Sequence, residues 1–494
     1  MKIAQYIGIG LLLIALGGTS CNQLLDINED PLAAKQDDID ANPEVLFVDI
    51  MVSLSSDRVL ETNVFNRWAQ YYVGASFGDA DNYSVPDYPQ NNTWATMYRK
   101  MIKNAVLGRR AAEKSDRPNV AAQFLIMEAV AYYHLTLMFE DVPLDEVMDF
   151  DGEQLFTRYP NYNSQEEVLI GVVNKLTDAI NSMQLGDDDR IVDQDLIYQG
   201  DLALWQLFAN SLRIKTLMIL SGKGAEYHEA LQIVFDQPYI TLLSQEAIFR
   251  YGNSIANANQ LYKLHQQFAD GQSQFFFASE PFVETLNSRL DPRIEVFFDR
   301  GQFNSSSAPH IGMEPGSGAA FVVTSVLSLN FITPTTPDIW QSAAELRFLK
   351  AEAITRGWIE GTAAEAQELY YTGVIQHCYH LNNFPGVIEK GATLSDFEIG
   401  TYLEDQVPDI SLMDAERALQ EIHFQQYIEA FGRGLDAWTF VRRTGFPDRP
   451  LPVNTALGGH LTRLPYAADE VSANTNIPDQ PALDKLMWFM SSEQ

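Results

Sequence analysis

Apolar residues spaced three and four positions apart along most of the chain constrain its fold more than any other feature. One such run contains five apolar residues: Leu125, Ala129, Tyr132, Leu135 and Phe139. This spacing places their side chains on a single face of an α-helix. The sequence therefore predicts a protein built mainly from amphipathic helices that pack against one another.

Breaker and cap residues set the predicted ends of these helices. Pro143 ends one helix and Gly222 ends another. Ser164 with Glu167 three positions later forms a capping-box pattern ahead of an apolar run, and Thr362 is the predicted cap of a later helix. The helices predicted in this way cover residues 168–183, 205–219, 343–358, 363–381, 419–431 and 435–441.

Short links between consecutive helices predict stacked helical hairpins. No sequence repeat of about 34 to 45 residues accompanies them. Two long stretches lack helical periodicity: 77–92 is rich in Asp, Asn, Tyr and Pro, and 301–337 is rich in Ser, Gly and Pro, with a strand-like patch at 321–326. Loops of this length are usually functional or disordered. No break in composition divides residues 44–494, which we expect to form a single domain.

The first 20 residues have the pattern of a targeting segment. Lys2 is their only charged residue, and the apolar run 7–16 is too short to span a membrane. The small residues that end at Cys21 resemble a bacterial lipobox, in which the cysteine is acylated. We expect a lipoprotein signal peptide at 1–20, a lipid anchor on Cys21 and a polar tether at 21–43. Ordinary secretion with an incidental cysteine is the alternative. No later stretch approaches 18 apolar residues, so we expect no membrane span in the mature chain.

Charge and cysteine content exclude several classes of function. The chain has 33 basic and 66 acidic residues and a net charge of −33, which repels phosphate, so we expect no nucleic-acid partner. If Cys21 is acylated, no intramolecular disulfide remains, because the other cysteine is Cys378, which we expect to be buried in a helix. The sequence has no GxSxG motif and no phosphate-binding glycine loop, and we expect no cofactor.

Three patterns suggest catalytic or metal chemistry but fit a structural role better. Glu345 and Glu352 share a helical face, where a glycosidase-like acid pair is the alternative to pairing with arginine. His377 and His380 have a zinc-compatible spacing, yet His377 continues an apolar stripe, which predicts a packed helix. The Asp-rich segment 186–195 lacks the spacing of an EF-hand, so a structural calcium is not indicated and we expect a solvated loop.

Two further sets of residues are expected to belong to the scaffold. Three arginines near the C-terminal end of this acidic chain are predicted to pair with carboxylates: Arg433, Arg442 and Arg443. Aromatic residues in helical surroundings are predicted to lie in the core: Trp68, Tyr71, Tyr72, Trp94 and Tyr98.

Several strings, in the same order along the chain, resemble the SusD/RagB family of nutrient-binding outer-membrane lipoproteins of Bacteroidetes. The matching strings are LDINEDP at 25–31, FEDVPL at 139–144 with Glu140 where the family has Gly, GD…W…ANSLR at 200–213, LDPR at 290–293, E…FLKAEA…RGW at 345–358, G…W…RRTG at 432–445 and RLPY…E…N at 463–474. Each string is weak alone, but together they cover nearly the whole chain.

The resemblance implies a mainly α fold with few short strands, in which a scaffold of tetratricopeptide-type helical hairpins carries an irregular, loop-rich lobe. It also implies a non-catalytic lipoprotein on the outer face of the outer membrane, which binds an oligosaccharide or a peptide. The implied partner is a TonB-dependent, SusC-like porin, to which the ligand is delivered. Two other classes stay open: a lipid-anchored surface glycoside hydrolase, and a structural scaffold without a small ligand.

In the family, ligand contacts lie in regions that correspond to the two irregular stretches. Sugars offer flat C–H faces that stack on aromatic rings and hydroxyl groups that bind amides and carboxylates. The predicted ligand-binding residues are Asp81, Asn82, Tyr83, Tyr88, Phe303, His310 and Phe321. We expect the rings of Tyr83 and Tyr88 to be exposed, since a polar loop offers little to bury them. Packing of these rings within the lobe is the alternative.

Overall fold

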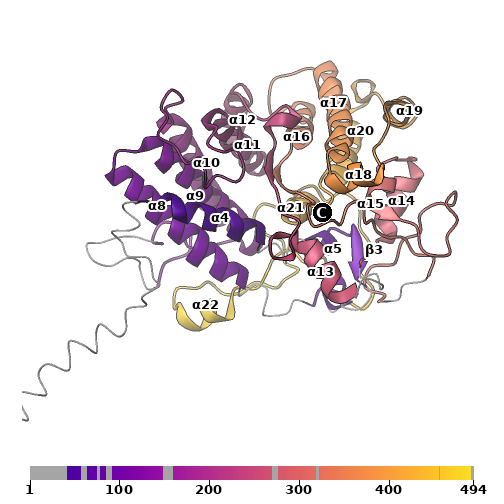
Figure 1. Cartoon of the computed structure of the whole chain (residues 1–494), viewed down its shortest axis with the longest axis horizontal. Coiled ribbons are helices and arrows are strands. Elements are labelled where there is room, and N and C mark those ends of the chain that lie inside the picture. Colours follow the sequence, from indigo (N-terminus) through magenta and orange to yellow (C-terminus); the bar gives the residue numbers. More distant parts are fainter. Residues whose placement is uncertain are drawn as a thin grey trace, which may run out of the picture.

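The computed structural model describes residues 42–56, 64–74, 78–84, 92–147, 159–269, 276–318, 322–455 and 457–490. Its helices form two neighbouring groups, one from the N-terminal half of the chain and one from the C-terminal half, with short strands below them (Figure 1). The predicted signal peptide, Cys21 and nearly all of the predicted tether lie outside the described residues.

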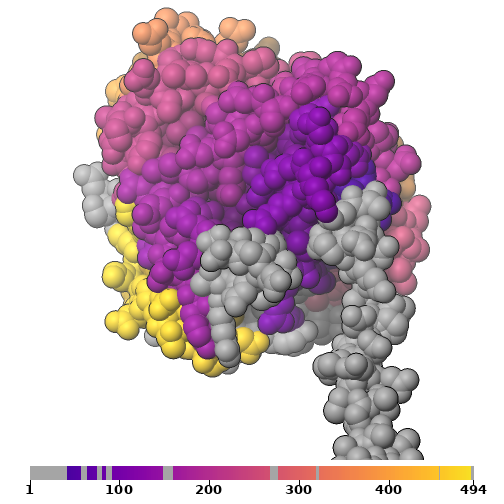
Figure 2. Space-filling model, turned by 90° about the vertical axis from the view of Figure 1, so that its left-hand side faces the viewer, coloured from indigo at the N-terminus to yellow at the C-terminus, as the bar shows by residue number. Residues whose placement is uncertain are grey.

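The N-terminal group comprises α4 Glu44–Ser56, η2 Thr96–Ile102, α8 Lys103–Lys114, α9 Pro118–Phe139, α10 Gln165–Ser182, α11 Leu202–Ser221, η3 Ala225–Tyr227 and α12 His228–Phe235. Each helix from α8 onwards packs against the next one in the chain. These helices form a continuous face, in indigo to magenta, with C-terminal residues in yellow at its lower left (Figure 2). Packing between sequence neighbours confirms the predicted scaffold of helical hairpins.

The C-terminal group comprises α16 Ala343–Thr355, α17 Ala363–Asn382, α18 Pro385–Lys390, α19 Asp396–Gln406, η6 Ile410–Leu412, α20 Ala415–Glu429 and α21 Gly434–Thr444. α16 packs against both α17 and α20, and it also contacts α11, which joins the two groups. The prediction of a mainly helical protein is thus confirmed.

Local capping chemistry explains where these helices begin and end. Ser164 caps α10 through a complete capping box, and Thr362 caps α17, as predicted. α20 begins four residues before its predicted start, because the Asp414 side chain accepts a hydrogen bond from the backbone N–H of Arg417. The break before α21 needs a glycine: Gly432 has φ +84°, and a Cβ there would lie 2.6 Å from the ring of Phe331.

Short strands and helices connect the two groups. One antiparallel sheet has the order β1 Tyr72–Gly74, β3 Phe276–Ala278, β5 Val326–Leu327 and β4 Phe298–Asp299, and β2 Ala247–Phe249 pairs with β6 Asp338–Gln341. A strand is predicted at 321–326. Of the described residues in that range, only Val326 lies in a strand, β5. The remaining short elements are α5 Asn66–Trp68, α6 Gly78–Asp81, η4 Leu243–Gln245, η5 Ile255–Asn257, α13 Gln260–Ala269, α14 Glu280–Ser288, α15 Ile294–Phe297 and α22 Ala468–Ala473.

Among the described residues, α9 is long and apolar enough to cross a membrane, judged by length and composition alone. The most apolar window of this helix is, however, 89% buried inside the protein. The helices that precede and follow α9 in the chain, α8 and α10, both pack against it. α9 is therefore the central helix of the N-terminal group, and its apolar character is that of a core element.

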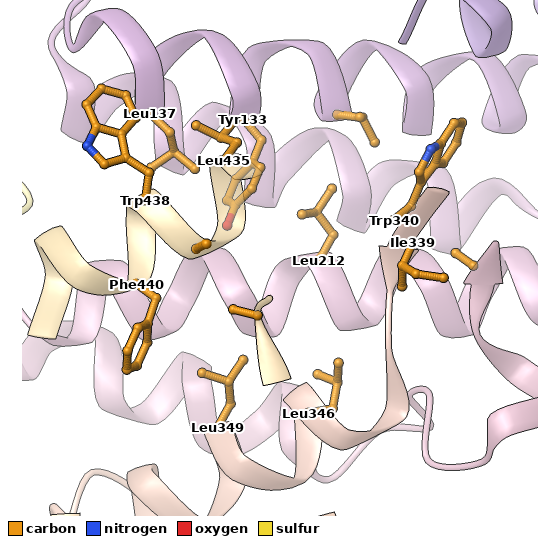
Figure 3. Close-up of a cluster of buried hydrophobic side chains, with 14 of the residues drawn as sticks. Tyr133, Leu137, Leu212, Ile339, Trp340, Leu346, Leu349, Leu435, Trp438 and Phe440 are labelled. Atoms are coloured by element: carbon orange, nitrogen blue, oxygen red, sulfur yellow. The ribbon is translucent and has the colours of Figure 1, made fainter. Parts of the chain in front are cut away.

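The hydrophobic core brings together side chains that are more than 300 positions apart in sequence, such as Tyr133 and Phe440. Figure 3 shows residues of α9, α11, β6, α16 and α21 in one cluster: Tyr133, Leu137, Leu212, Ile339, Trp340, Leu346, Leu349, Leu435, Trp438 and Phe440. Four of the five aromatic residues predicted to lie in the core are buried: Trp68, Tyr71, Tyr72 and Trp94. The fifth, Tyr98, is partly buried against the same core.

Buried ion pairs lie beside this cluster. Both carboxylate oxygens of Glu352 accept hydrogen bonds from the guanidinium of Arg443, at 2.7 and 2.8 Å, and Nε of Arg356 lies 2.9 Å from Oε1. Glu345 pairs with Lys215 at 3.2 Å and with Arg433 at 2.9 Å. The two glutamates therefore have the structural role that we preferred to a catalytic acid pair.

Arg442, predicted to pair with a carboxylate, donates to the backbone carbonyl oxygens of Leu137 and Thr462, where the end of α9 meets the chain that follows α21. One other prediction needs correction. Asp195, predicted to lie in a solvated loop, is buried. Its side chain accepts hydrogen bonds from three backbone N–H groups and from the indole of Trp205.

Glu352→Gln tests the ionic cluster. Burial raises the pKa of Glu352, but Arg443 and His423 outweigh it and hold that pKa well below its ordinary value. The stabilisation is therefore present above about pH 4.3 and is lost as pH falls further. We expect Glu352→Gln to lower the free energy of unfolding at pH 7 by about 3–5 kcal/mol, since two arginines lose their partner.

Urea denaturation at pH 7, 5 and 3.5 measures this effect. The difference between wild type and variant should shrink as pH falls. Glu365→Gln, on the exposed first turn of α17, is the matched control and should change stability by no more than about 0.5 kcal/mol. An equal, small effect of both substitutions would contradict the assignment.

Candidate ligand-binding surface

The four-stranded sheet determines where the two irregular stretches leave the scaffold. β1 leads into the stretch 77–92, while β4 and β5 bracket the stretch 300–325. Neighbouring strands in the order β1-β3-β5-β4 are antiparallel, so β1 and β5 are parallel to each other. The first stretch therefore follows the C-terminal end of β1. The second precedes the N-terminal end of β5, which lies at the opposite end of the strands.

Asp81 closes a turn that follows β1. Its Oδ1 lies 2.5 Å from Nε of Arg67, and its Oδ2 accepts a hydrogen bond from the backbone N–H of Gly74 at 2.9 Å. The side chains of Asp81 and Arg67 are each 1% exposed. Burial raises the pKa of Asp81, and the charge of Arg67 opposes that shift. The carboxylate predicted to contact a ligand thus holds the turn together from inside the protein.

Tyr83 is buried, so the expectation of an exposed ring is wrong for this residue. Its hydroxyl lies 2.5 Å from Nδ1 of His460, whose Nε2 lies 3.1 Å from the carbonyl oxygen of Arg449. A carbonyl oxygen only accepts, so Nε2 carries the proton. Burial and the charge of Arg449 lower the pKa of His460 to about 4. At neutral pH, Nδ1 therefore accepts the hydrogen bond that the Tyr83 hydroxyl donates.

Asn82 lies between Asp81 and Tyr83 and is partly exposed. Its Oδ1 accepts a hydrogen bond from the backbone N–H of Ser84 at 3.3 Å. Of the predicted contact residues in this turn, Asn82 is the one whose side chain reaches solvent. Tyr88 lies outside the described residues, so its predicted exposure stays a prediction.

The second stretch contains one exposed and one buried candidate. The Phe303 side chain is 71% exposed, in a turn where Asn304 donates to the carbonyl oxygen of Pro309 at 3.0 Å. His310 is buried, with Nδ1 3.0 Å from Oγ of Ser325 and Nε2 3.3 Å from a carboxylate oxygen of Glu295. His310 therefore anchors the stretch to the start of β5. Phe321 lies outside the described residues.

The C-terminal stretch 448–460 links the two irregular stretches. It contacts the first through His460 and Tyr83. It contacts the second where the backbone N–H of Val453 donates to the carbonyl oxygen of Pro315 at 3.0 Å. Gly316, with φ +81°, permits this approach, because a Cβ there would lie 2.2 Å from the carbonyl oxygen of Val453. No direct hydrogen bond between the two stretches occurs among their described residues, so 448–460 completes the surface.

We did not predict 448–460 as part of the surface. Its sequence shows only proline-rich coil composition, and the hydrogen bond from Tyr83 joins residues 377 positions apart. No local pattern carries that information. We call Asn82, Phe303 and the described residues around them, together with 448–460, the candidate surface.

The histidine pair considered as a zinc site serves two different networks. Nδ1 of His377 lies 2.9 Å from Nη1 of Arg293, and Nδ1 of His380 lies 2.7 Å from a carboxylate oxygen of Glu246. Burial and the neighbouring Arg293 lower the pKa of His377 well below its ordinary value. Within the described residues, no group of three or more His, Cys, Asp or Glu side chains could hold a metal ion. Cys378 is buried, as predicted.

Comparison with protein families decides the relationship. A SusD-like family, described as "Starch-binding associating with outer membrane", matches residues 35–466. The chain belongs to the SusD-like family. No curated protein gives a significant match to this SusD-like chain.

Solved structures support the same fold. A protein described as chitin-binding superposes with a TM-score of 0.75 at 22% identity, over 88% of this chain and 95% of that one. A SusD homologue from Bacteroides fragilis gives 0.73 at 22% identity, over 90% and 98%. A chitin-binding SusD homologue from Flavobacterium johnsoniae gives 0.71 at 19% identity, over 91% and 99%. At these identities, the likeness establishes the SusD-like fold and nothing about the ligand.

Substitutions at Tyr83 separate packing from ligand contact. We expect Tyr83→Phe to lower the free energy of unfolding by about 1 kcal/mol, because one buried hydrogen bond is lost. Tyr83→Ala should lower it by about 3 kcal/mol, because a buried aromatic side chain is removed. Chemical denaturation measures both values. Phe303→Ala is the exposed control and should change stability by no more than about 0.5 kcal/mol. A Tyr83→Ala variant as stable as wild type would show that the ring does not pack.

Proposed function

We propose that this SusD-like protein is a lipid-anchored, non-catalytic binding protein on the outer face of the outer membrane. In this proposal it captures an oligosaccharide on the candidate surface and delivers it to a partner TonB-dependent, SusC-like transporter. Membership of a family described as starch-binding and associated with the outer membrane is the observation that carries the proposal. The lipobox-like residues before Cys21 supply the anchor.

The accessible side chains of the candidate surface suit a saccharide. The exposed ring of Phe303 offers a flat apolar face for the C–H groups of a sugar. The partly exposed amide groups of Asn82 and Asn304 can donate to and accept from hydroxyl groups. Two neighbours with solved structures are described as chitin-binding, and one of these is described as a SusD homologue, which favours a glycan over a peptide. A peptide ligand remains the alternative that the binding experiment distinguishes.

The state of the acidic residues supports binding without catalysis. A glycosidase needs two carboxylates that face the scissile bond across a cleft. Glu345 and Glu352 are the acid pair that the sequence analysis considered as a glycosidase alternative. Both are held in ion pairs inside the scaffold. In the candidate surface, Asp81 is likewise engaged with Arg67. We therefore propose that the protein is not an enzyme.

Calorimetric titration of the mature chain tests ligand binding. Titrants are soluble oligomers of N-acetylglucosamine, starch-derived oligosaccharides and, for comparison, a mixture of tryptic peptides. We expect an oligosaccharide to bind and to be recovered intact by chromatography after prolonged incubation. The double substitution Asn82→Ala, Phe303→Ala should weaken binding about tenfold, since it removes a stacking contact and a hydrogen bond.

Leu412→Ala is the matched control, because Leu412 is 84% exposed on η6, within the C-terminal helix group. It should leave binding unchanged. Wild-type affinity in the double variant would remove the candidate surface from consideration. Binding of peptides alone, or sustained release of shortened oligosaccharides, would overturn the proposed function.

Cys21→Ala tests the anchor. We expect this variant to move from the membrane fraction to the soluble fraction, because it lacks the thiol that is acylated. Its melting temperature should match that of the mature wild type, since Cys21 precedes the first described helix, α4. Asn22→Ala, the control, should stay with the membrane. Retention of Cys21→Ala in the membrane fraction would contradict the lipobox interpretation.

A further inference from the structure

A cavity lies between η2, the turn after α9 and α22, and neither Asn82, Phe303 nor any described residue of 448–460 lines it. The cavity has a volume of about 460 Å³, within the range of roughly 300–1,000 Å³ for small-molecule sites. α22 lies at the lower edge of the N-terminal helices (Figure 1). The residues that line the cavity include Trp94, Tyr98, Arg99, Asp469, Glu470 and Ala473.

The aromatic wall of the cavity is fixed in position. The ring of Trp94 lies 4.9 Å from that of Tyr98 and 5.0 Å from that of Phe139, measured between centroids. Tyr466 packs edge-on against Trp94 at 6.0 Å. The Tyr98 hydroxyl donates to the carbonyl oxygen of Pro143 at 2.9 Å. A ligand that enters the cavity therefore meets a preformed aromatic surface.

Trp94 differs from the other buried tryptophans in its hydrogen bonding. Each of the others donates its indole N–H to a protein acceptor, as is usual for a buried indole: Trp68, Trp205, Trp340 and Trp438. Trp94 is only 7% exposed, yet no described residue accepts a hydrogen bond from it. Its indole nitrogen is not among the buried, unpartnered side-chain atoms of the described residues, and Trp94 lines the cavity.

The rim of the cavity carries polar groups of both signs. Arg99 is exposed, and no carboxylate among the described residues pairs with it. Oε1 of Glu470 accepts hydrogen bonds from the hydroxyl of Tyr162 at 3.0 Å and from the amide of Asn474 at 2.9 Å. These two bonds hold the carboxylate in place and leave Oε2 without a partner among the described residues. Asp469 adds a second exposed carboxylate.

We propose that this cavity binds a single neutral sugar ring, as a second saccharide site of the protein. The Trp94 and Tyr98 rings would pack against its C–H groups. The indole N–H and Arg99 would donate to its oxygens, and Glu470 would accept from its hydroxyls. The rim carries both positive and negative groups, so an anionic ligand would be repelled by Asp469 and Glu470 and a cationic ligand by Arg99. The cavity therefore disfavours a charged ligand. The proposal rests on the proposed function only for the saccharide nature of the ligand.

Saturation-transfer NMR on the full mature chain tests the proposal with three probes, the methyl β-glycosides of glucose, galactose and N-acetylglucosamine. We expect at least one to bind at millimolar concentration. Arg99→Ala should weaken its binding about tenfold, because a hydrogen bond from a charged donor is lost. Lys100→Ala, at the neighbouring exposed position of η2 that does not line the cavity, is the matched control and should have no effect.

A steric pair of variants makes the test independent of charge. Ala473→Trp places a large ring at the cavity mouth and should abolish binding, whereas Val471→Trp, on the exposed side of the same helix, should not. Both residues are exposed on α22, so neither change disturbs the core. Leu412→Ala, outside both the cavity and the candidate surface, should leave glycoside binding unchanged.

The outcomes separate this proposal from the proposed function. If none of the glycosides binds, or if binding survives either Arg99→Ala or Ala473→Trp unchanged, the cavity site is wrong, while oligosaccharide binding by calorimetry still stands. If a glycoside binds and responds to Ala473→Trp although no oligosaccharide titrates, the cavity site is right and the proposed function fails.

Discussion

Ion pairs buried where α11, α16, α20 and α21 meet are the interaction on which the rest of the structure depends. Glu352 is fully buried and bound by Arg443, and Glu345 lies between Lys215 and Arg433. A charge left unpaired at this depth costs several kcal/mol. The four helices can therefore assemble only in the register in which each charge meets its partner. None of the residues described in the two irregular stretches takes part in this cluster.

The stretch that follows α21, from Phe446 to α22, has a coil-like sequence, but it connects the scaffold to both saccharide sites that we propose. The guanidinium of Arg442 lies 3.5 Å above the ring centroid of Trp438 and donates to the carbonyl oxygens of Leu137 and Thr462. This ties α21 to the end of α9 and to the stretch itself. From there, the stretch runs back through His460 to the candidate surface and onwards to α22 at the cavity.

Chemistry between residues close in sequence was predictable, and chemistry between distant residues was not. The caps at Ser164 and Thr362, the buried Cys378 and the helical stripes follow from spacing alone. The same reasoning placed Tyr83 in solvent, because a polar loop cannot reveal that a residue 377 positions away covers it. It also could not reveal that Glu140, where the family has Gly, has a φ of +75° and that its side chain pairs with Arg463.

By itself, the sequence determined the helical class, the ends of most major helices and the likeness to the SusD-like family, while the anchor at Cys21 stays a prediction. All of these depend on periodicity, on caps within four residues or on ordered short strings. Only the tertiary structure decided which predicted contact residues reach solvent, with Asn82 and Phe303 accessible and Asp81, Tyr83 and His310 buried. The tertiary structure also decided that Trp94 lines a cavity. The exposure of a side chain depends on which distant segment packs over it, and the local spacing of residues cannot predict that.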